Sequence, residues 1–181
     1  MAKVDRRIQK TQAALKNAIL ELMAQKNLDN ITIQDLSDRA NVSRGTIYLH
    51  YTDKFDLLDK LIESHINELR GLCESAADLD LVGATLIWAE YFDSNYSFFS
   101  TMLASKGAPY FRNRFQNFLV EELRQEVDVT EGKNQGLLAE VLVQFIASAQ
   151  LGVVEWWFTH ERPVTPQVLA KQLGTLLERN I

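Results

Sequence analysis

The chain has 181 residues, enough for one or two domains with a buried core, and its 46% hydrophobic and 24% charged residues are ordinary for a globular protein. One cysteine and three histidines exclude an internal disulfide framework and a cysteine-based zinc site, so we expect neither a metal nor a cofactor. The first residues contain no apolar stretch of signal-peptide length, which predicts a cytoplasmic protein.

The net charge of -5 argues weakly against a nucleic-acid binder, but its two signs are unevenly distributed along the chain. Residues 1–60 carry ten Lys and Arg against eight Asp and Glu, whereas residues 61–181 carry nine against sixteen. Of the seventeen aromatic residues, fourteen lie between Trp88 and Phe158. A mildly basic front and an acidic, aromatic-rich back indicate two tasks in one chain.

Apolar residues recur at steps of three and four along the whole chain, and no stretch alternates with period two for long, so we expect an all-α fold. Thr32 and Asp35 have the spacing of a capping box, and Thr165-Pro166 is a typical helix start. The predicted helices cover residues 6–25, 32–40, 43–51, 52–73, 79–92, 94–105, 109–127, 133–160 and 165–179.

The helices predicted at 32–40 and 43–51 are short and are separated only by a tight break at residues 41–42. Such a pair, with apolar residues that face a third helix, is a helix-turn-helix. We expect its shared core to consist of Ile33, Leu36, Ala40, Val42 and Ile47.

The second helix of the pair is the candidate reader of DNA. Its expected exposed residues are Ser43, Arg44, Thr46, Tyr48, Leu49 and His50. Arg44 can bind a guanine edge with two hydrogen bonds, and Tyr48 and Leu49 can contact thymine methyl groups. The alternative is an ordinary polar helix face that reads nothing.

Two neighbouring features suit contact with the DNA backbone. Gly45 lacks a side chain, so it lets protein and DNA approach closely. Lys54 lies in the first turn of the next predicted helix, where an ammonium group and a helix N-terminus can bind the same phosphate. Arg6, Arg7 and Lys10 could add backbone contacts, or form a merely solvated face.

The stretch VSRGTIYLHY at residues 42–51, followed by Asp53-Lys54 and Leu57-Leu58, resembles the DNA-binding domain of the TetR family of transcriptional regulators. The resemblance implies a helix-turn-helix domain at residues 1–54 and a larger helical domain, which binds an effector and dimerises, at residues 55–181. It also implies that the DNA contacts come from Thr32, Arg44, Gly45, Thr46, Tyr48, His50 and Lys54. Leu49 departs from the family pattern, and Tyr51 takes the place of a core Phe.

The C-terminal part resembles one subgroup of this family, which includes regulators similar to the dihydroxyacetone-kinase activator. The similarity lies in residues 152–157, 162–163 and 165–170. In the family the last two helices pair with their mates in a dimer. The apolar segment 137–158 fits that role, because it is long enough to span a membrane but carries Glu140 and Glu155, and acids in mid-span are costly.

The aromatic residues of the back half have two interpretations, a packed core or an apolar effector pocket between helices. We expect a few of them to line a cavity, and Gln150 to contact either the ligand or the dimer mate. The expected pocket residues are Trp88, Phe92, Phe99, Met102, Phe115 and Gln150. A paired His65 and Glu68 lack further ligands for a metal site, and Cys73 is expected to be inert.

These features together predict a homodimeric repressor that binds a roughly palindromic double-stranded operator and is released by a small-molecule effector. The alternative within the same family is an activator, or a co-activator acting through a protein partner. An enzyme on a helical bundle is disfavoured, because the scattered histidines and single cysteine supply no catalytic cluster. The remaining rival is an interaction protein that keeps the helix-turn-helix but reads no DNA.

Overall fold

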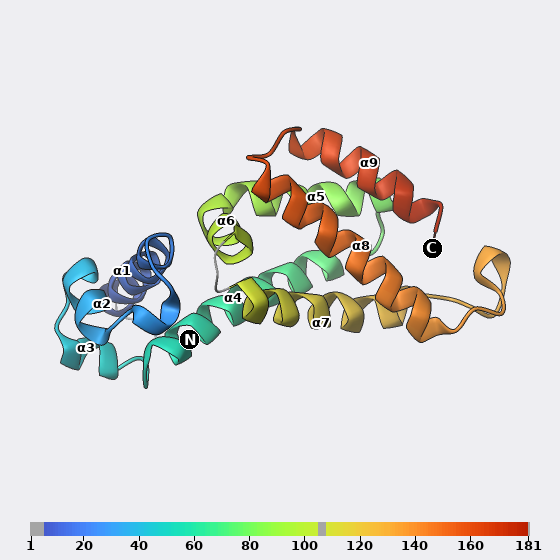
Figure 1. Cartoon of the computed structure of the whole chain (residues 1–181). Helices are drawn as coiled ribbons and strands as arrows, with labels where there is room; N and C mark the ends of the chain where they lie inside the picture. The colour runs from blue at the N-terminus through green and yellow to red at the C-terminus, as the bar shows by residue number, and fades with distance from the viewer. Residues whose placement is uncertain (1–5, 105–107, 181) are drawn as a thin grey trace. The chain divides into compact units, whose positions relative to one another are not determined.

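The computed structural model describes residues 6–104 and 108–180, and within them it contains helices and no strand (Figure 1). The predicted all-α fold is therefore confirmed. The chain forms two compact units, the first ending at His65 and the second beginning at Ile66. We call them the N-terminal unit and the C-terminal unit and describe each by itself.

From residue 6 onward, the N-terminal unit is built from four helices and a short 3-10 turn around one apolar core. Leu15, Leu36, Ile47, Leu57 and Ile62 are fully buried in it, which follows the three- and four-residue spacing of apolar positions. The elements are α1 (Arg6–Met23), η1 (Leu28–Asn30), α2 (Ile33–Ala40), α3 (Arg44–Tyr48) and the first part of α4 (Lys54–Ser75).

Helix α4 belongs to both units, because it continues without interruption from Lys54 to Ser75. The two units divide inside this helix, after His65. The sequence placed the domain boundary earlier, between residues 54 and 55, at the start of the helix. The difference arises because Leu57, Leu58, Leu61 and Ile62, all on the first part of α4, are buried with the core of the N-terminal unit.

The described residues of the C-terminal unit form the rest of α4 and five further helices. Helix α5 packs extensively along α9, and α8 packs against both α7 and α6 (Figure 1). The further helices are α5 (Leu81–Ser94), α6 (Tyr96–Ala104), α7 (Ala108–Glu126), α8 (Ala139–Thr159) and α9 (Pro166–Glu178). These bounds agree with the predicted ones within three residues, apart from the start of α8 and the predicted end of α6 at Ser105, which lies outside the described residues.

The helix predicted at residues 133–160 begins later than expected, at Ala139. Residues 132–134 form a 3-10 turn, η2 (Gly132–Asn134), and Gly132 and Gly136 have φ angles of 70° and 85°. Such left-handed residues interrupt an α-helix, and glycine adopts them without a steric penalty. The two glycines therefore place the start of the helix further along the chain. The spacing of apolar residues does not indicate this.

Helix α8 has three distinct faces. One face is buried in the C-terminal unit and includes Ile146, Ala147 and Leu151. A polar face bonds to α7: Arg124 reaches Glu140 at 2.9 Å, Gln116 reaches Ser148 at 3.2 Å and Arg112 reaches Glu155 at 2.6 Å. The third face is apolar and exposed, with Val141, Phe145 and Trp156 at 63%, 59% and 43% exposure.

Helix α8 is also the one helix in the described part of the chain that is long and apolar enough to cross a membrane. The packing of one face into the C-terminal unit and the polar bonds to α7 favour a helix of a folded domain.

Candidate functional site

The entry to the helix-turn-helix is fixed by hydrogen bonds around Thr32. Its hydroxyl accepts from the Asp35 backbone N–H at 3.1 Å, and the Asp35 carboxylate accepts from the Thr32 N–H at 2.7 Å, which completes the predicted capping box. Lys26 Nζ lies 2.8 Å from the same carboxylate. The hydrogen bond from Lys26, followed by those from Thr32, holds the pKa of Asp35 well below its usual range.

The turn between α2 and α3 is held by backbone geometry and one buried hydroxyl. Asn41 ends α2 in the left-handed region with φ 53°, a conformation that Asn tolerates better than most residues. Ser37, which is buried, donates its hydroxyl hydrogen to the Val42 carbonyl at 2.6 Å. Ser43 then caps α3 by accepting from the Thr46 N–H at 3.0 Å. The left-handed Asn41 and the hydrogen bonds of Ser37 and Ser43 therefore fix the orientation of α3 against α2.

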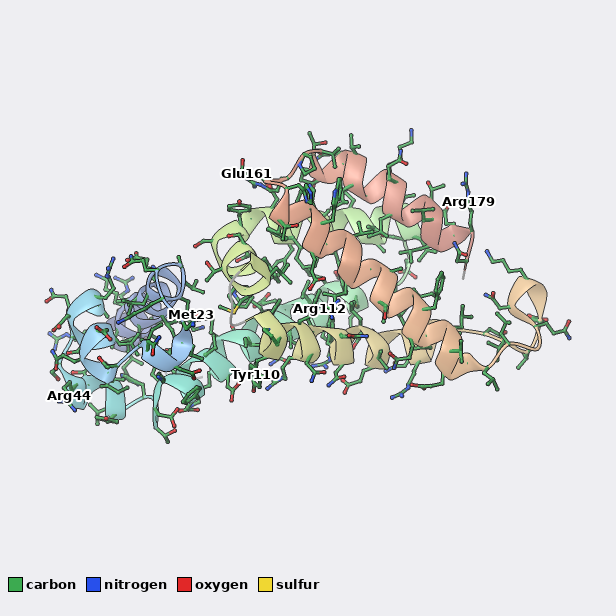
Figure 2. The ribbon with its side chains drawn as sticks, viewed as in Figure 1. Met23, Arg44, Tyr110, Arg112, Glu161 and Arg179 are labelled. Atoms are coloured by element: carbon green, nitrogen blue, oxygen red, sulfur yellow. The ribbon has the colours of Figure 1, made fainter. Side chains whose placement is uncertain are left out.

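The outer face of α3 carries side chains that the N-terminal unit does not use for its own packing. Tyr48 is 54% exposed and Leu49 is 80% exposed, although both are large and largely apolar. Arg44 is exposed and has no hydrogen bond or ion pair with any described residue. Figure 2 shows it at the outer side of the helix pair, pointing away from the helices of its unit. The Ser43 and Thr46 hydroxyls lie 2.8 Å apart and bond to each other.

The residues that follow α3 anchor it to α4. Tyr51 is buried, as expected for the position of a core aromatic residue. The half-buried His50 lies beside it, with ring centroids 6.3 Å apart, and its carbonyl accepts from Lys60 Nζ at 3.2 Å. Gly45 is exposed, and a Cβ there would meet only the Ser43 hydroxyl, at 3.7 Å.

The Lys54 ammonium group, which the sequence predicts to bind a phosphate, is bonded within its own unit. Its Nζ donates to three backbone carbonyls of the same unit: Leu28 at 2.8 Å, Asp29 at 2.7 Å and Ile31 at 2.8 Å. An ammonium group has three N–H donors, so all of them are used inside the protein. Lys54 therefore connects the start of α4 to η1 and to Ile31, the residue before the capping box.

A cavity of about 250 Å³ lies inside the C-terminal unit. Four of the six expected pocket residues line it, namely Trp88, Phe92, Phe115 and Gln150. Phe99 and Met102 do not, because α6 packs into the aromatic core instead. Phe99 is fully buried there, with its ring centroid 4.7 Å from that of Phe92.

The cavity also has lining residues that the sequence did not indicate. Helix α9 supplies Leu169, Leu173 and Leu177, which are four residues apart on its buried face. Glu122 and Glu126 on α7 carried no signal at all, because a charged residue on a helix is usually solvated. Cys73 lines the cavity too, and burial raises the pKa of its thiol to about 11, so it is neutral.

Within residues 6–104 and 108–180, no cluster of three or more His, Cys, Asp or Glu side chains is arranged to hold a metal ion. Burial lowers the pKa of His65 to about 4.

Two family models match the chain, and together they include both units. The model described as "Bacterial regulatory proteins, tetR family" matches residues 15–61, and the model described as "Transcriptional regulator C-terminal region" matches residues 84–179. Families of this class are transcriptional regulators and are generally not enzymes.

Similar proteins of known structure share the fold over nearly the whole chain. The TetR transcriptional regulator from Streptococcus agalactiae 2603V is 30% identical, with a TM-score of 0.69, and the match covers 95% of this chain and 96% of that one. The dihydroxyacetone kinase operon activator DhaS is 18% identical, with a TM-score of 0.66 and coverage of 94% and 96%. At that identity DhaS shows the shared fold alone.

A curated relative is the uncharacterized helix-turn-helix transcriptional regulator YxbF of Bacillus subtilis (strain 168), 22% identical over 180 residues. The match covers 93% of this chain and 45% of YxbF, so the chain spans less than half the length of the curated relatives that it matches. The family models, the full-length structural similarity and the capped helix pair agree. The chain belongs to the TetR family of transcriptional regulators.

Proposed function

We propose that the chain acts in the cytoplasm as a homodimeric repressor, which binds a palindromic operator and leaves it when a small molecule occupies the cavity of the C-terminal unit. The observation that carries the DNA-binding part is the outer face of α3. A rigidly capped helix presents Arg44, Tyr48 and Leu49 to solvent without a packing role. Large exposed side chains on a fixed helix are typical of a recognition helix.

In this proposal each side chain on the outer face of α3 makes a different contact with DNA. Arg44 binds a guanine edge in the major groove, and Tyr48 and Leu49 contact thymine methyl groups. The short side chains of Ser43, Gly45 and Thr46 at the start of α3 allow close approach to the DNA. His50 and Thr32 contact phosphates, and the Thr32 hydroxyl does so by turning its hydrogen from the Asp35 carboxylate to a phosphate oxygen. Lys54 acts indirectly, by holding α2 and α4 in register.

The exposed apolar face of α8 supports the homodimer. Val141, Phe145, Gly152 and Trp156 follow one another at steps of four, seven and four, so they share one side of the helix. Gly152 has nothing within 4 Å of the position of a Cβ, which leaves room for a second helix to approach. Leu176 and Val168 on α9 are also exposed, at 51% and 45%. Contiguous exposed apolar surface of this kind marks protein interfaces.

The cavity supports the effector part of the proposal. Helix α4 begins at Lys54, next to the helix-turn-helix, and its Cys73 lines the cavity. An occupant that favours one position of this helix over another would shift the population of DNA-binding conformations. Repression is typical of the family. An activator remains the alternative, because DhaS, which shares the fold, is named as an operon activator.

Selection of binding sites from random double-stranded DNA by the full chain tests the proposal. We expect an inverted repeat whose half-sites lie about one helical turn apart. Arg44→Ala should weaken binding about 10- to 100-fold and relax the preference at one base pair in each half-site. Arg179→Ala, at the residue that follows α9 in the C-terminal unit, is the control and should leave binding unchanged. Enrichment of no inverted repeat would refute operator binding.

The homodimer is tested separately by Phe145→Asp, measured by sedimentation equilibrium. A charge on the exposed apolar face should convert the dimer into a monomer, because an unpaired carboxylate would have to be buried in the interface. Phe55→Asp is the matched control, since Phe55 is also an exposed phenylalanine, 48%, but lies on α4 in the N-terminal unit. If the Phe145 variant remains dimeric, the interface lies elsewhere.

A further inference from the structure

The cavity of the C-terminal unit has an uneven chemistry that indicates what it binds. Most of its wall is apolar, with the rings of Trp88, Phe92 and Phe115 on α5 and α7. Its polar side chains are those of Cys73, Thr85, Glu122, Glu126 and Gln150. Among the described residues that line it there is no Lys, Arg or His.

Two of these polar groups are already satisfied inside the protein. The Thr85 hydroxyl donates to the Leu81 carbonyl at 2.6 Å. The Cys73 thiol bonds to Trp88 and to Glu122, and burial, followed by the Glu122 charge, raises its pKa to about 11, so it is neutral. Neither group therefore requires a partner from a ligand.

Gln150 differs, because its Oε1 is buried and has no hydrogen-bond donor. A buried carbonyl oxygen without a donor costs free energy, so such an atom is usually paired. Gln150 lies on α8 among cavity-lining residues. A ligand with an N–H or O–H group could supply the missing bond.

The two carboxylates add a second requirement, since Glu122 and Glu126 are one helical turn apart on α7 and repel each other. Arg70 Nε lies 3.3 Å from Glu122, but the same guanidinium also lies 3.5 Å from Glu121. Glu126 is exposed and has no ion pair with any described residue. This part of the cavity wall therefore carries excess negative charge, which a cation would offset.

We propose that the cavity binds a small aromatic amine in its protonated form. The ring lies among Trp88, Phe92 and Phe115, the ammonium group faces Glu122 and Glu126, and a second N–H donates to Gln150 Oε1. The cavity of about 250 Å³ exceeds the roughly 150 Å³ that holds a benzene ring, so it has room for an aromatic ring system with a short side chain. This inference rests on the proposed function, because it names the class of the effector.

Three indole probes separate the requirements when titrated into the full chain by calorimetry. Tryptamine has both the ammonium group and the ring N–H, 1-methyltryptamine lacks the ring N–H, and indole-3-propionate replaces the cation with a carboxylate. We expect tryptamine to bind at least about tenfold more tightly than either of the others. Equal or tighter binding of indole-3-propionate, or no binding of either amine, would overturn the inference.

Variants assign the preference to residues. Glu122→Gln with Glu126→Gln should remove the preference for tryptamine over indole-3-propionate, whereas Glu131→Gln, at an exposed position outside the cavity wall, should keep it. Gln150→Leu should make tryptamine and 1-methyltryptamine bind equally. The single variant Glu126→Gln keeps the test valid if the double variant fails to fold, because Glu126 is exposed and its replacement should not disturb folding. It should at least halve the preference for tryptamine over indole-3-propionate. A preference that survives all of these changes contradicts the assignment.

The same samples separate this inference from the proposed function. If the chain selects an inverted repeat but prefers the anionic probe, the regulator stands and the amine class fails. If it binds tryptamine through Glu122, Glu126 and Gln150 but selects no DNA, the ligand class stands and the regulator fails. If both hold, tryptamine should lower operator affinity in proportion to its occupancy of the cavity.

Discussion

The N-terminal and C-terminal units differ in where their large side chains and their unpaired polar groups lie. In the N-terminal unit the polar groups that shape α2 and α3 are bonded locally, as at Thr32, Asp35 and Ser43, while the large side chains of Tyr48 and Leu49 remain outside. In the C-terminal unit the large aromatic side chains are mostly inside, and yet a cavity and the unpaired Gln150 oxygen remain. A rigid scaffold with free side chains suits a partner of fixed shape, and an incompletely filled interior suits a small ligand.

The comparison can be tested most strongly in the aromatic core. Phe99→Ala should lower the free energy of unfolding of the C-terminal unit by about 3–5 kcal/mol, because Phe99 is fully buried and touches Phe92, Phe98 and Phe158. Urea unfolding followed by tryptophan fluorescence measures this unit, since all three tryptophans lie in it. Tyr110→Ala, at a 48% exposed position on α7 in the same unit, should change far less. A loss below about 1 kcal/mol for Phe99 would mean that the core repacks.

The contact between α5 and α9 is the next test. A Cβ at Gly174 would lie 2.6 Å from Val82 Cα, so Gly174→Ala must separate the two helix backbones. We expect a loss of about 1–3 kcal/mol in the unfolding free energy. Gly71→Ala on α4 is the control, because nothing lies within 4 Å of its Cβ position and the change should stabilise the helix by up to about 1 kcal/mol. Equal effects of the two changes would contradict the close approach.

A substitution of Lys54 tests how much its three hydrogen bonds stabilise the N-terminal unit. Lys54→Met should cost about 1–3 kcal/mol, because three carbonyl oxygens lose their donor. Faster hydrogen exchange of the α2 amides measures the loss without DNA. Lys10→Met, at an exposed position on α1, is the control. Unchanged exchange combined with weaker DNA binding would restore the phosphate contact as the role of Lys54.

The smallest expected effect is the pH dependence of the capping box. Because the folded pKa of Asp35 lies below its ordinary 3.8, its stabilising contribution is complete above that value and is lost as the pH falls below it. Asp35→Asn should therefore be less stable than the parent chain by a constant amount from pH 7 to about 5, and the difference should shrink below about 3.8. Urea midpoints across this range, followed by circular dichroism, measure it. A difference that grows in acid would contradict the assigned cause.

The helical periodicity, the capping residues and the exposure of Arg44, Tyr48 and Leu49 could be predicted from the sequence because each depends on neighbours within one or two turns. Thr32 and Asp35 form the expected capping box, and Tyr51 is buried as the family pattern implied. The start of α8 was missed because the φ angles of Gly132 and Gly136 are not encoded in apolar spacing. Glu140 and Glu155 stood out as acids in an apolar segment of the sequence, but their bonds to α7 could not be read from it.

The sequence by itself determined the all-α fold, the helix-turn-helix and the family, because these follow from local spacing and from a motif of consecutive residues. Only the tertiary structure decided which groups meet across the chain. It turned the Lys54 ammonium group inward onto carbonyls 23 to 26 residues away, placed Phe99 in the core, and brought Glu122, Glu126 and Gln150 to one cavity. The physical reason is that a side chain's partner depends on how the helices pack, which the periodicity of a single helix does not specify.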